Sequence, residues 1–234
     1  MSMTDVTVSY GATLAIEHAT FTVPVGSVMG LIGPNGAGKS TIIKAGLELM
    51  DHTGTVRFFG KPLGEVRRKV AYMPQVAAVD WDYPITVEQV VTMGMYTELG
   101  WLRRNNAAHR GRVMEVLDRV GIADLAKRQI SELSGGQRRR VFVARILVQA
   151  PELYLLDEPF AGVDAASERV IRGVLHELRD QGATIVIVHH DLSTVAELCD
   201  HVTILNREII ATGPTSEAFT RENITKAFGL GLLE

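Results

Sequence analysis

Three short apolar runs divide the chain and alternate with longer stretches that carry apolar residues at helical spacing. The runs are Val28–Ile32, Leu153–Leu156 and Thr184–Val188. Continuous apolar runs of this length are typical of strands that are buried on both faces, as in a parallel sheet covered by helices. The pattern therefore predicts an α/β fold. Residues 3–27 and 54–72 instead alternate apolar and polar positions, which predicts an additional small antiparallel sheet.

Helices are expected between the apolar runs. A glycine-rich turn follows the first run and leads into a helix from about Lys39 to Leu49. A second helix is expected over Ala165–Gln181, where one stripe is apolar, and Gly182 ends it. Residues 86–150 show helical periodicity and predict a helical insertion between the first and second core strands. One stripe of this insertion contains Val113, Val116, Leu117 and Val120.

The composition is that of an ordinary folded protein. The chain has 234 residues, 46% of them hydrophobic and 22% charged, which suits one large domain spanning residues 1–234. A net charge of −3 argues against a protein that coats nucleic acid. Cys199 is the single cysteine, as in proteins of reducing compartments. Neither a secretion signal nor an apolar run of about 18 residues is present, so we expect a soluble cytoplasmic protein.

A glycine-rich motif directly follows the first apolar run. Residues 33–40 match the phosphate-binding pattern Gly-x-x-x-x-Gly-Lys-[Ser/Thr] in full. Backbone N–H groups of such a loop turn inward around an anion, and the following helix adds the positive end of its dipole. Lys39 is placed to reach the β- and γ-phosphates of a nucleotide, and Ser40 to bind Mg²⁺. A plain glycine-rich turn is the alternative, which the strand before the motif and the helix after it disfavour. The predicted phosphate-binding residues are Gly33, Pro34, Asn35, Gly36, Ala37, Gly38, Lys39, Ser40 and Thr41.

Two acidic residues, Asp157 and Glu158, close the second apolar run. Because both acids continue the strand in this interpretation, we expect their side chains to point to opposite faces of the sheet. We expect Asp157 to hold Mg²⁺ through water, and Glu158 to orient or deprotonate the water that attacks the γ-phosphate. A helix cap is the alternative role for such an acid. Two acids after a wholly apolar strand, in a chain with a phosphate-binding loop, favour nucleotide hydrolysis.

A third motif lies nearly 100 residues after the phosphate-binding loop and reads Leu133-Ser134-Gly135-Gly136-Gln137. It precedes an amphipathic helix, and a Ser-Gly-Gly turn at a helix N-terminus is a second anion site. With these three motifs in this order, the chain resembles the nucleotide-binding subunits of ATP-binding cassette (ABC) transporters, whose signature sequence reads LSGGQ as it stands here. The resemblance covers essentially the whole chain.

The resemblance implies a P-loop NTPase (RecA-like) core, an antiparallel β subdomain and a helical subdomain at about residues 76–150 that carries the signature. It also implies roles for four further residues. Tyr10 would stack on adenine, unless it is simply a core residue. Gln75 would sense Mg²⁺ and the attacking water, unless it is an ordinary loop glutamine. Asp164 would cross a dimer interface, cap the following helix, or do both. His190 would contact the γ-phosphate, with a structural role as the alternative.

The same resemblance implies a head-to-tail homodimer that shares ATP and Mg²⁺ between its subunits. The signature turn of one subunit, Ser134, Gly135, Gly136 and Gln137, would complete the nucleotide site of the other. ATP would favour the closed dimer, and hydrolysis the open one. Since no membrane span is visible, separate integral membrane permease subunits would dock on the helical insertion near Gln75. The subunit itself would then be peripheral on the inner face of the cell membrane.

Three segments resemble the branch of manganese, zinc and iron importers, namely Val79–Val87, Gly100–Arg104 and Glu158–Asp164. This resemblance implies import of a metal ion, with an extracytoplasmic metal-binding protein as a further partner. Metal selectivity would reside in the membrane and extracytoplasmic subunits. Asp80 and Asp82 are candidate metal ligands, but a solvated acidic loop is the favoured interpretation.

The chain departs from the family pattern in two places. His189 stands where the family usually has Thr, and arginines follow the signature where many members have Gln or Lys. A metal chelate formed by His189 and His190 is disfavoured, because adjacent strand residues face opposite ways. The basic runs Arg67–Lys69 and Arg138–Arg140 are expected to be solvated faces.

Two other classes of function compete with the transport ATPase. A non-transport ABC ATPase acting on DNA or ribosomes usually carries two fused cassettes or long coiled coils, and this chain shows neither. A small-molecule kinase would share the phosphate-binding loop but leaves the Ser134–Gln137 turn unexplained. The favoured function is an ATP-binding and ATP-hydrolysing subunit that energises metal import.

Overall fold

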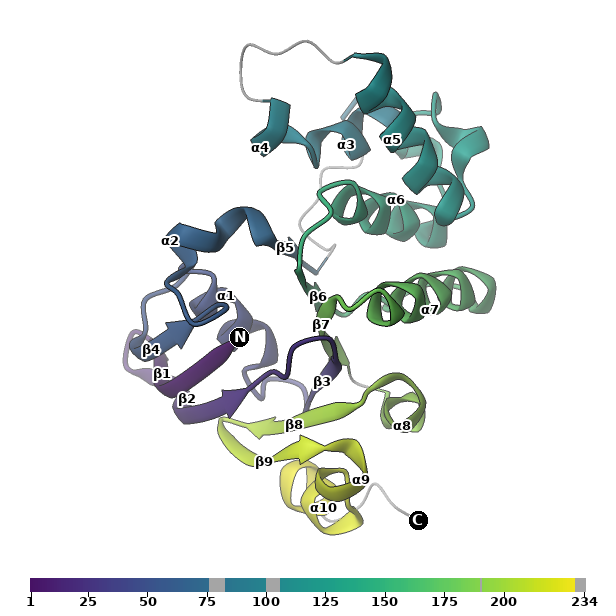
Figure 1. The fold of residues 1–234 in the computed structure, drawn as a ribbon. Helices are drawn as coiled ribbons and strands as arrows, with labels where there is room; N and C mark the ends of the chain where they lie inside the picture. Colours follow the sequence, from purple (N-terminus) through teal and green to yellow (C-terminus); the bar gives the residue numbers. More distant parts are fainter. Residues whose placement is uncertain (76–82, 100–105, 190, 230–234) are drawn as a thin grey trace.

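The computed structural model describes residues 1–75, 83–99, 106–189 and 191–229 (Figure 1). Its centre is a six-stranded sheet in the order β5-β6-β7-β3-β8-β9. Strands β5 to β8 in this order run parallel, and β9 pairs antiparallel with β8 at one edge. The bounds are Val70–Met73 (β5), Leu153–Asp157 (β6), Thr184–His189 (β7), Val28–Ile32 (β3), His201–Asn206 (β8) and Glu208–Pro214 (β9). The three strands predicted from apolar runs are neighbours at the centre of the sheet, which confirms the α/β prediction.

A second sheet contains three antiparallel strands in the order β2-β1-β4. Its strands are Ser2–Tyr10 (β1), Thr13–Thr22 (β2) and Thr53–Arg57 (β4). The predicted antiparallel sheet is confirmed for these strands, but its extension to residue 72 was wrong. Val70–Met73 belongs to the central sheet, where it pairs in parallel with β6. Because β5 is an edge strand, its alternate side chains are only partly covered, so it shows the alternation that we attributed to the other sheet.

Helices cover both faces of the central sheet. The helical region α3–α6 gathers at the top of Figure 1, away from the antiparallel sheet, and α6 lies beside α7. Helix α1 ends at Gly46 instead of Leu49, because Glu48 has a left-handed φ of 59°. No helix in the described parts of the chain is long and apolar enough to cross a bilayer. The helices are α1 (Lys39–Gly46), α2 (Leu63–Val66), α3 (Val87–Met93), α4 (Tyr96–Leu99), α5 (Ala107–Arg119), α6 (Gly135–Leu147), α7 (Ala165–Asp180), α8 (Val195–Leu198), α9 (Thr215–Ala218) and α10 (Arg221–Phe228).

Successive residues of the central strands face two separate cores. Val28 and Ile32 of β3 lie in the core that the sheet shares with α3, α5, α6 and α7. Met29 and Leu31 lie in the core that the sheet shares with α1 and the antiparallel strands. Because neighbouring strand residues point to opposite faces, a strand covered on both sides must be apolar throughout. The two cores hold the carboxyl ends of β3, β6 and β7 at one edge of the sheet, where an α/β fold places its ligands.

Candidate functional site

The glycine-rich loop connects the carboxyl end of β3 to α1. Gly38 is the N-cap residue of α1 and has a left-handed φ of 97°. A Cβ at this position would overlap the side chain of Ile16, so both backbone conformation and space require glycine. The turn places the N-terminus of α1, with its backbone N–H groups, at the cleft that the loop lines. Such an end attracts anions, as the sequence predicted for a phosphate-binding loop.

Lys39 begins α1 and is only 6% exposed. Its Nζ donates to the carbonyl oxygens of Gly33 at 2.7 Å and Pro34 at 2.8 Å, so the side chain folds back along the loop. Burial lowers the pKa of Lys39, and the negative charges of Glu158 and Asp157 oppose that shift. Because the hydrogen bonds of this buried ammonium go to neutral carbonyl oxygens, a charged phosphate oxygen would be a stronger acceptor for it.

Ser40 and Asp157 form the second contact between the loop and the sheet. The Ser40 hydroxyl donates to Oδ1 of Asp157 at 2.9 Å, across 117 positions of sequence. Asp157 is completely buried, and its Oδ2 has no hydrogen-bond partner among the described residues. Burial raises the pKa of Asp157, and the hydrogen bond from Ser40 opposes the shift. A hydroxyl and a carboxylate with an unused oxygen are donors that suit Mg²⁺, which prefers oxygen ligands.

Glu158 is placed by a turn and not by the strand. Strand β6 ends at Asp157, and Glu158 has a left-handed φ of 52°. The expectation that both acids continue the strand was therefore wrong. The Glu158 carboxylate accepts a hydrogen bond from Nε2 of Gln75 at 3.1 Å. A non-glycine residue with positive φ stores backbone strain, which the N–H···O contact from Glu158 to Val188, at 3.2 Å, helps to hold.

Lys39, Ser40, Gln75 and Glu158 border one open cleft of about 430 Å³, whereas the buried Asp157 contacts Ser40 without lining the cleft itself. Tyr10 lies at its rim and is 54% exposed, with its hydroxyl 3.3 Å from Oγ1 of Thr41, so its interpretation as a core residue was wrong.

Arg207, from the β8–β9 turn, also lines the cleft, and sequence reasoning missed it. Its N–H donates to Ala37 at 3.0 Å, a contact that no local pattern indicates. The cleft lining comprises Tyr10, Thr13, Leu14, Ala15, Asn35, Gly36, Ala37, Gly38, Lys39, Ser40, Thr41, Gln75, Glu158 and Arg207.

The signature turn lies outside this cleft in the same chain. Ser134 and Gln137 form a capping box at the start of α6, in which each side chain accepts from the other's backbone N–H. Gly136 is buried against α7, and a Cβ there would overlap Asp164 and Ser167. The structure therefore brings the phosphate-binding loop, Gln75 and Glu158 together, but keeps the signature turn apart from them.

Asp164 caps α7. Its carboxylate accepts hydrogen bonds from the N–H of Ser167 at 2.8 Å and from the Ser167 hydroxyl at 2.9 Å. These bonds lower the pKa of Asp164. The capping role that the sequence allowed for Asp164 is thus present, while a role across a dimer interface stays a prediction.

The arginines after the signature are not a solvated face, and that expectation was wrong. Arg139 is 5% exposed and donates to the carbonyl oxygen of Ala161 at 3.1 Å. Arg138 and Arg140 are half-buried and donate to carbonyl oxygens of Ser131 and Gly121. Because α6 packs against α3, α5 and α7, its polar residues meet protein on several sides. The exposure of Arg67–Lys69 matches the expectation.

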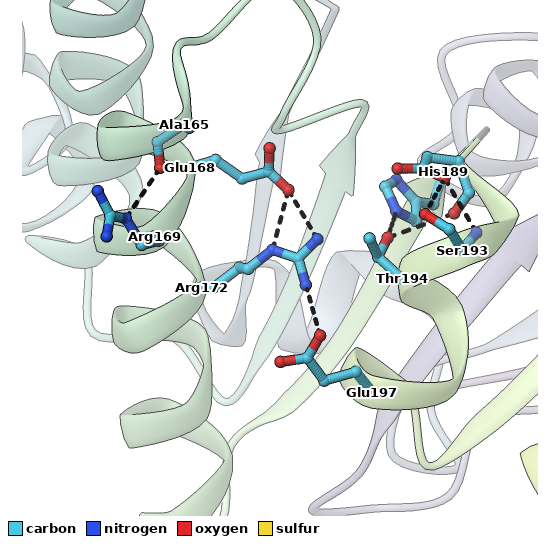
Figure 2. A network of polar contacts seen from close by, with 9 residues as sticks. Ala165, Glu168, Arg169, Arg172, His189, Ser193, Thr194 and Glu197 are labelled. Carbon is cyan, nitrogen blue, oxygen red and sulfur yellow. Dashed lines mark hydrogen bonds and ion pairs between the residues drawn. The ribbon is translucent and has the colours of Figure 1, made fainter.

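His189 is buried at the end of β7, and Figure 2 shows its surroundings. Its Nε2 lies 2.5 Å from Oγ1 of Thr194, and its ring meets Phe160 edge-on with centroids 5.5 Å apart. Arg172 covers Phe160 at 5.4 Å and is itself held by two glutamates of α7 and α8. His190, the predicted γ-phosphate contact, lies outside the described residues, as do Asp80 and Asp82.

Comparisons with known proteins agree with this geometry. A family model described as "ABC transporter" matches residues 16–161. The chain is 48% identical over 226 residues to the zinc transport system ATP-binding protein TroB of Treponema pallidum (strain Nichols), covering 96% of this chain and 85% of TroB. It is 45% identical over 230 residues to the manganese transport system ATP-binding protein MntB of Bacillus subtilis (strain 168), covering 98% of this chain and 92% of MntB. Among solved structures, cbiO1 from Clostridium perfringens, part of the ABC transporter complex cbiONQ, is similar with a TM-score of 0.79 at 28% identity, covering 96% of this chain and 92% of cbiO1.

Proposed function

The chain belongs to the ABC transporter family as an ATP-binding, ATP-hydrolysing subunit, and from this premise we propose that it energises the import of a manganese, zinc or iron ion through separate membrane subunits. The observation that carries the proposal is the convergence of Lys39, Ser40, Gln75 and Glu158 on one cleft, although they lie far apart in sequence. The metal is inferred from the names of TroB and MntB, which assign zinc and manganese transport to those relatives.

In this proposal the cleft binds ATP with its phosphates against the α1 N-terminus. Lys39 exchanges its loop carbonyl partners for the β- and γ-phosphates, which are far stronger acceptors. Tyr10, exposed at the rim, offers a ring for stacking on adenine. Glu158, hydrogen-bonded to Gln75, orients or deprotonates the attacking water. His190 contacts the γ-phosphate in this scheme, on the basis of the family resemblance.

Mg²⁺ would be held by Ser40, Asp157 and Gln75. The fit rests on Asp157 Oδ2, a buried carboxylate oxygen that lacks a hydrogen-bond partner among the described residues. When bound, Mg²⁺ neutralises part of the charge on the phosphate oxygens. Asp157 and Ser40 already point toward each other at 2.9 Å, so they offer two oxygen ligands without rearrangement of the backbone.

A head-to-tail homodimer completes the proposed site. The residues Ser134–Gln137 are absent from the cleft lining of their own chain, and Ser134 and Gly135 are exposed. An exposed helix N-terminus is free to bind the phosphates held by a second copy. In that arrangement Asp164, beside the signature turn, also lies close to the partner. ATP thereby favours the closed dimer, and hydrolysis favours opening.

The proposed partners are integral membrane permease subunits and an extracytoplasmic metal-binding protein. The permease docks on the helical region next to Gln75, which places the subunit peripherally on the inner face of the cell membrane. Gln75 suits this coupling because it is exposed and hydrogen-bonded to Glu158. A movement of the permease at this surface is therefore transmitted to the catalytic acid. A net charge of −3 gives no support to a nucleic-acid partner.

Metal uptake in a strain that lacks the gene tests the proposal. Uptake of labelled manganese, zinc and iron is measured after return of the wild type, of Glu158→Gln, or of Glu152→Gln. Glu152 is an exposed acid paired with Lys69 and makes a matched control, because it receives the same substitution outside the cleft. We expect the wild type and E152Q to restore uptake of one metal and E158Q to leave it at the deletion level. Full uptake with E158Q, or no response of any of the three metals, would contradict the proposal.

A further inference from the structure

The turn that carries Glu158 is closed by its own backbone. The N–H of Ala161 donates to the carbonyl oxygen of Glu158 at 3.2 Å, immediately after the left-handed residue. This turn joins β6 to the cap of α7 at Asp164. Any displacement of Ala161 therefore moves the backbone from which the Glu158 side chain projects.

Arg139 holds this turn from α6. Its Nη2 donates to the carbonyl oxygen of Ala161 at 3.1 Å, and the residue is 5% exposed. Its Nη1 is buried without a hydrogen-bond partner in the described parts of the chain. Burial lowers the pKa of Arg139, while the charges of Glu158 and Asp157 act in the opposite direction. A guanidinium stays charged under such conditions, so the two acids of the site are its electrostatic counterparts.

A second arginine shows what a purely structural clamp on this turn looks like. Arg172 covers the Phe160 ring. Its guanidinium is neutralised by Glu168 at 2.6 Å and Glu197 at 3.6 Å (Figure 2). Arg139 has no carboxylate at ion-pair distance within the described ranges. A buried cation without a carboxylate at ion-pair distance is costly, and packing alone gives no reason to keep it. We therefore take Glu158 and Asp157, the acids at the end of β6, as the groups that balance the positive charge of Arg139.

Arg139 also lies close to the signature turn. It is two residues after Gln137, which closes the capping box of α6. One turn earlier, Gly136 packs directly against Asp164 and Ser167. The first turns of α6 are thus tied to the Glu158–Asp164 segment at two points, at its middle residue Ala161 by Arg139 and at its end, Asp164, by Gly136. A shift of the signature turn is transmitted to Ala161 through a short, buried and directional contact.

We propose that Arg139 is a positioning residue that couples the signature turn to Glu158 within one subunit. The inference rests on the proposed function, because in a head-to-tail dimer the signature turn meets the partner's ATP while Glu158 serves the subunit's own. Binding of the signature turn to the partner's ATP then positions the Glu158 turn for hydrolysis of the subunit's own ATP. Gln or Lys, which many family members have after the signature, would offer one donor nitrogen for this link, whereas the guanidinium of Arg139 offers several donors in a rigid fork.

The test compares Arg139→Met with Arg140→Met in the full-length protein. Both variants lose a guanidinium from α6, but Arg140 donates to Val120 and Gly121 and, within the part of the chain that the structure describes, has no hydrogen bond to the Glu158 turn. We expect R139M to lower kcat at saturating Mg-ATP at least tenfold, with ATP affinity unchanged within twofold and a Hill coefficient that falls toward 1. R140M should keep kcat within threefold of the wild type.

Two further variants keep the test decisive if R139M does not fold. Arg139→Lys keeps a charge and a donor for Ala161 and should recover most of kcat. Arg139→Gln keeps only a neutral donor and should remain low. A kcat of R139M equal to that of R140M, an equal loss of ATP affinity and kcat, or an unchanged Hill coefficient would each overturn the inference.

A separate measurement keeps this inference apart from the proposed function. Glu158→Gln is expected to form a stable dimer with ATP, as seen by size-exclusion chromatography with light scattering. If E158Q stays monomeric, the proposed shared site fails. If E158Q dimerises but R139M turns over ATP like R140M, the assignment of Arg139 alone fails.

Discussion

Replacement of Asp157 by Asn is expected to stabilise the ligand-free protein while abolishing its response to Mg-ATP. The Asp157 carboxylate is completely buried, and Oδ2 lacks a hydrogen-bond partner among the described residues. An unsatisfied buried polar atom costs about 1–3 kcal/mol, and more when it is charged. Asn keeps the shape and the acceptor for Ser40 but carries no charge. The hydroxyl of Tyr72 lies near this side chain, and burial together with Asp157 raises the pKa of Tyr72 to about 12. This hydroxyl has no hydrogen-bond partner among the described residues and can accept from the new amide group.

The magnitude follows from that buried oxygen. A gain of about 1–2 kcal/mol corresponds to a rise in Tm of roughly 2–8 °C for a protein of this size. Differential scanning calorimetry of the ligand-free proteins measures it. Asp51→Asn is the matched control, because Asp51 is exposed and its replacement should change the free energy of unfolding by less than about 0.5 kcal/mol.

The difference between D157N and the wild type should also depend on pH. Burial raises the pKa of Asp157 above its value in the unfolded chain, so the native state binds the proton more readily. The stability contributed by this group is present below the unfolded pKa and is lost as pH rises through the folded pKa. The advantage of D157N is therefore largest at neutral and alkaline pH and shrinks in acid. Urea unfolding of both proteins at pH 8 and pH 5 measures this change.

Mg-ATP should reverse the ranking of the two proteins. At 100 times its Kd, a ligand stabilises the native state by about 2.7 kcal/mol, which is a Tm rise of roughly 5–10 °C here. We expect this rise for the wild type and little of it for D157N. A wild type more stable than D157N at pH 8 without ligand, or an equal response of both to Mg-ATP, would refute the assignment of Asp157.

Three further substitutions test other parts of the site. Glu158→Gln should lower turnover at least about 100-fold with ATP affinity retained, because a general base contributes about 10²–10⁴-fold; steady-state kinetics with nucleotide titration measure both. Lys39→Ala removes charge-assisted hydrogen bonds, of which a single one is worth about 1.5–3 kcal/mol, so calorimetric titration should show ATP binding weakened by at least roughly 10- to 150-fold. Ser134→Arg should spare ATP binding by the monomer but prevent ATP-dependent dimerisation, measured by light scattering in the E158Q background.

Each of these substitutions has an outcome that would count against its premise. Wild-type turnover in E158Q would remove Glu158 from hydrolysis, and unchanged ATP affinity in K39A would remove Lys39 from phosphate binding. Ser134→Ala is the control for S134R, because it also loses the helix cap, worth about 1 kcal/mol, but adds no bulk. A dimer in S134R as stable as in S134A would contradict the shared site.

Much of the fold follows from local patterns. The strands of the central sheet are apolar throughout because both of their faces are covered, and this shows in Val28–Ile32 without any tertiary information. The phosphate-binding loop was equally predictable, since its glycines and Lys39 serve a backbone geometry that is formed within a few residues. Edge strand β5 was assigned to the wrong sheet because partial exposure produces the same alternation in either setting.

The candidate site was predictable by residue type but not by arrangement. Asp157 and Glu158 were found from their position after an apolar strand, yet the left-handed turn at Glu158 was not, because neighbouring contacts hold that strain. Arg207 was missed because the β8–β9 turn reaches the loop only after the sheet has formed. The signature turn was found, but its separation from the cleft in one chain became visible only in three dimensions.

By itself, then, the sequence determined the elements and the chemical groups, because hydrophobic periodicity, capping boxes and glycine turns are short-range properties of the chain. The tertiary structure decided which groups meet. Arg139 illustrates the division: in sequence it belongs to a basic run that resembles a solvated face, and in the fold it is 5% exposed and bound to Ala161. The burial of Arg139 depends on the packing of α6 against the turn at Ala161, 22 positions further along the chain, and that packing is a property of the assembled core.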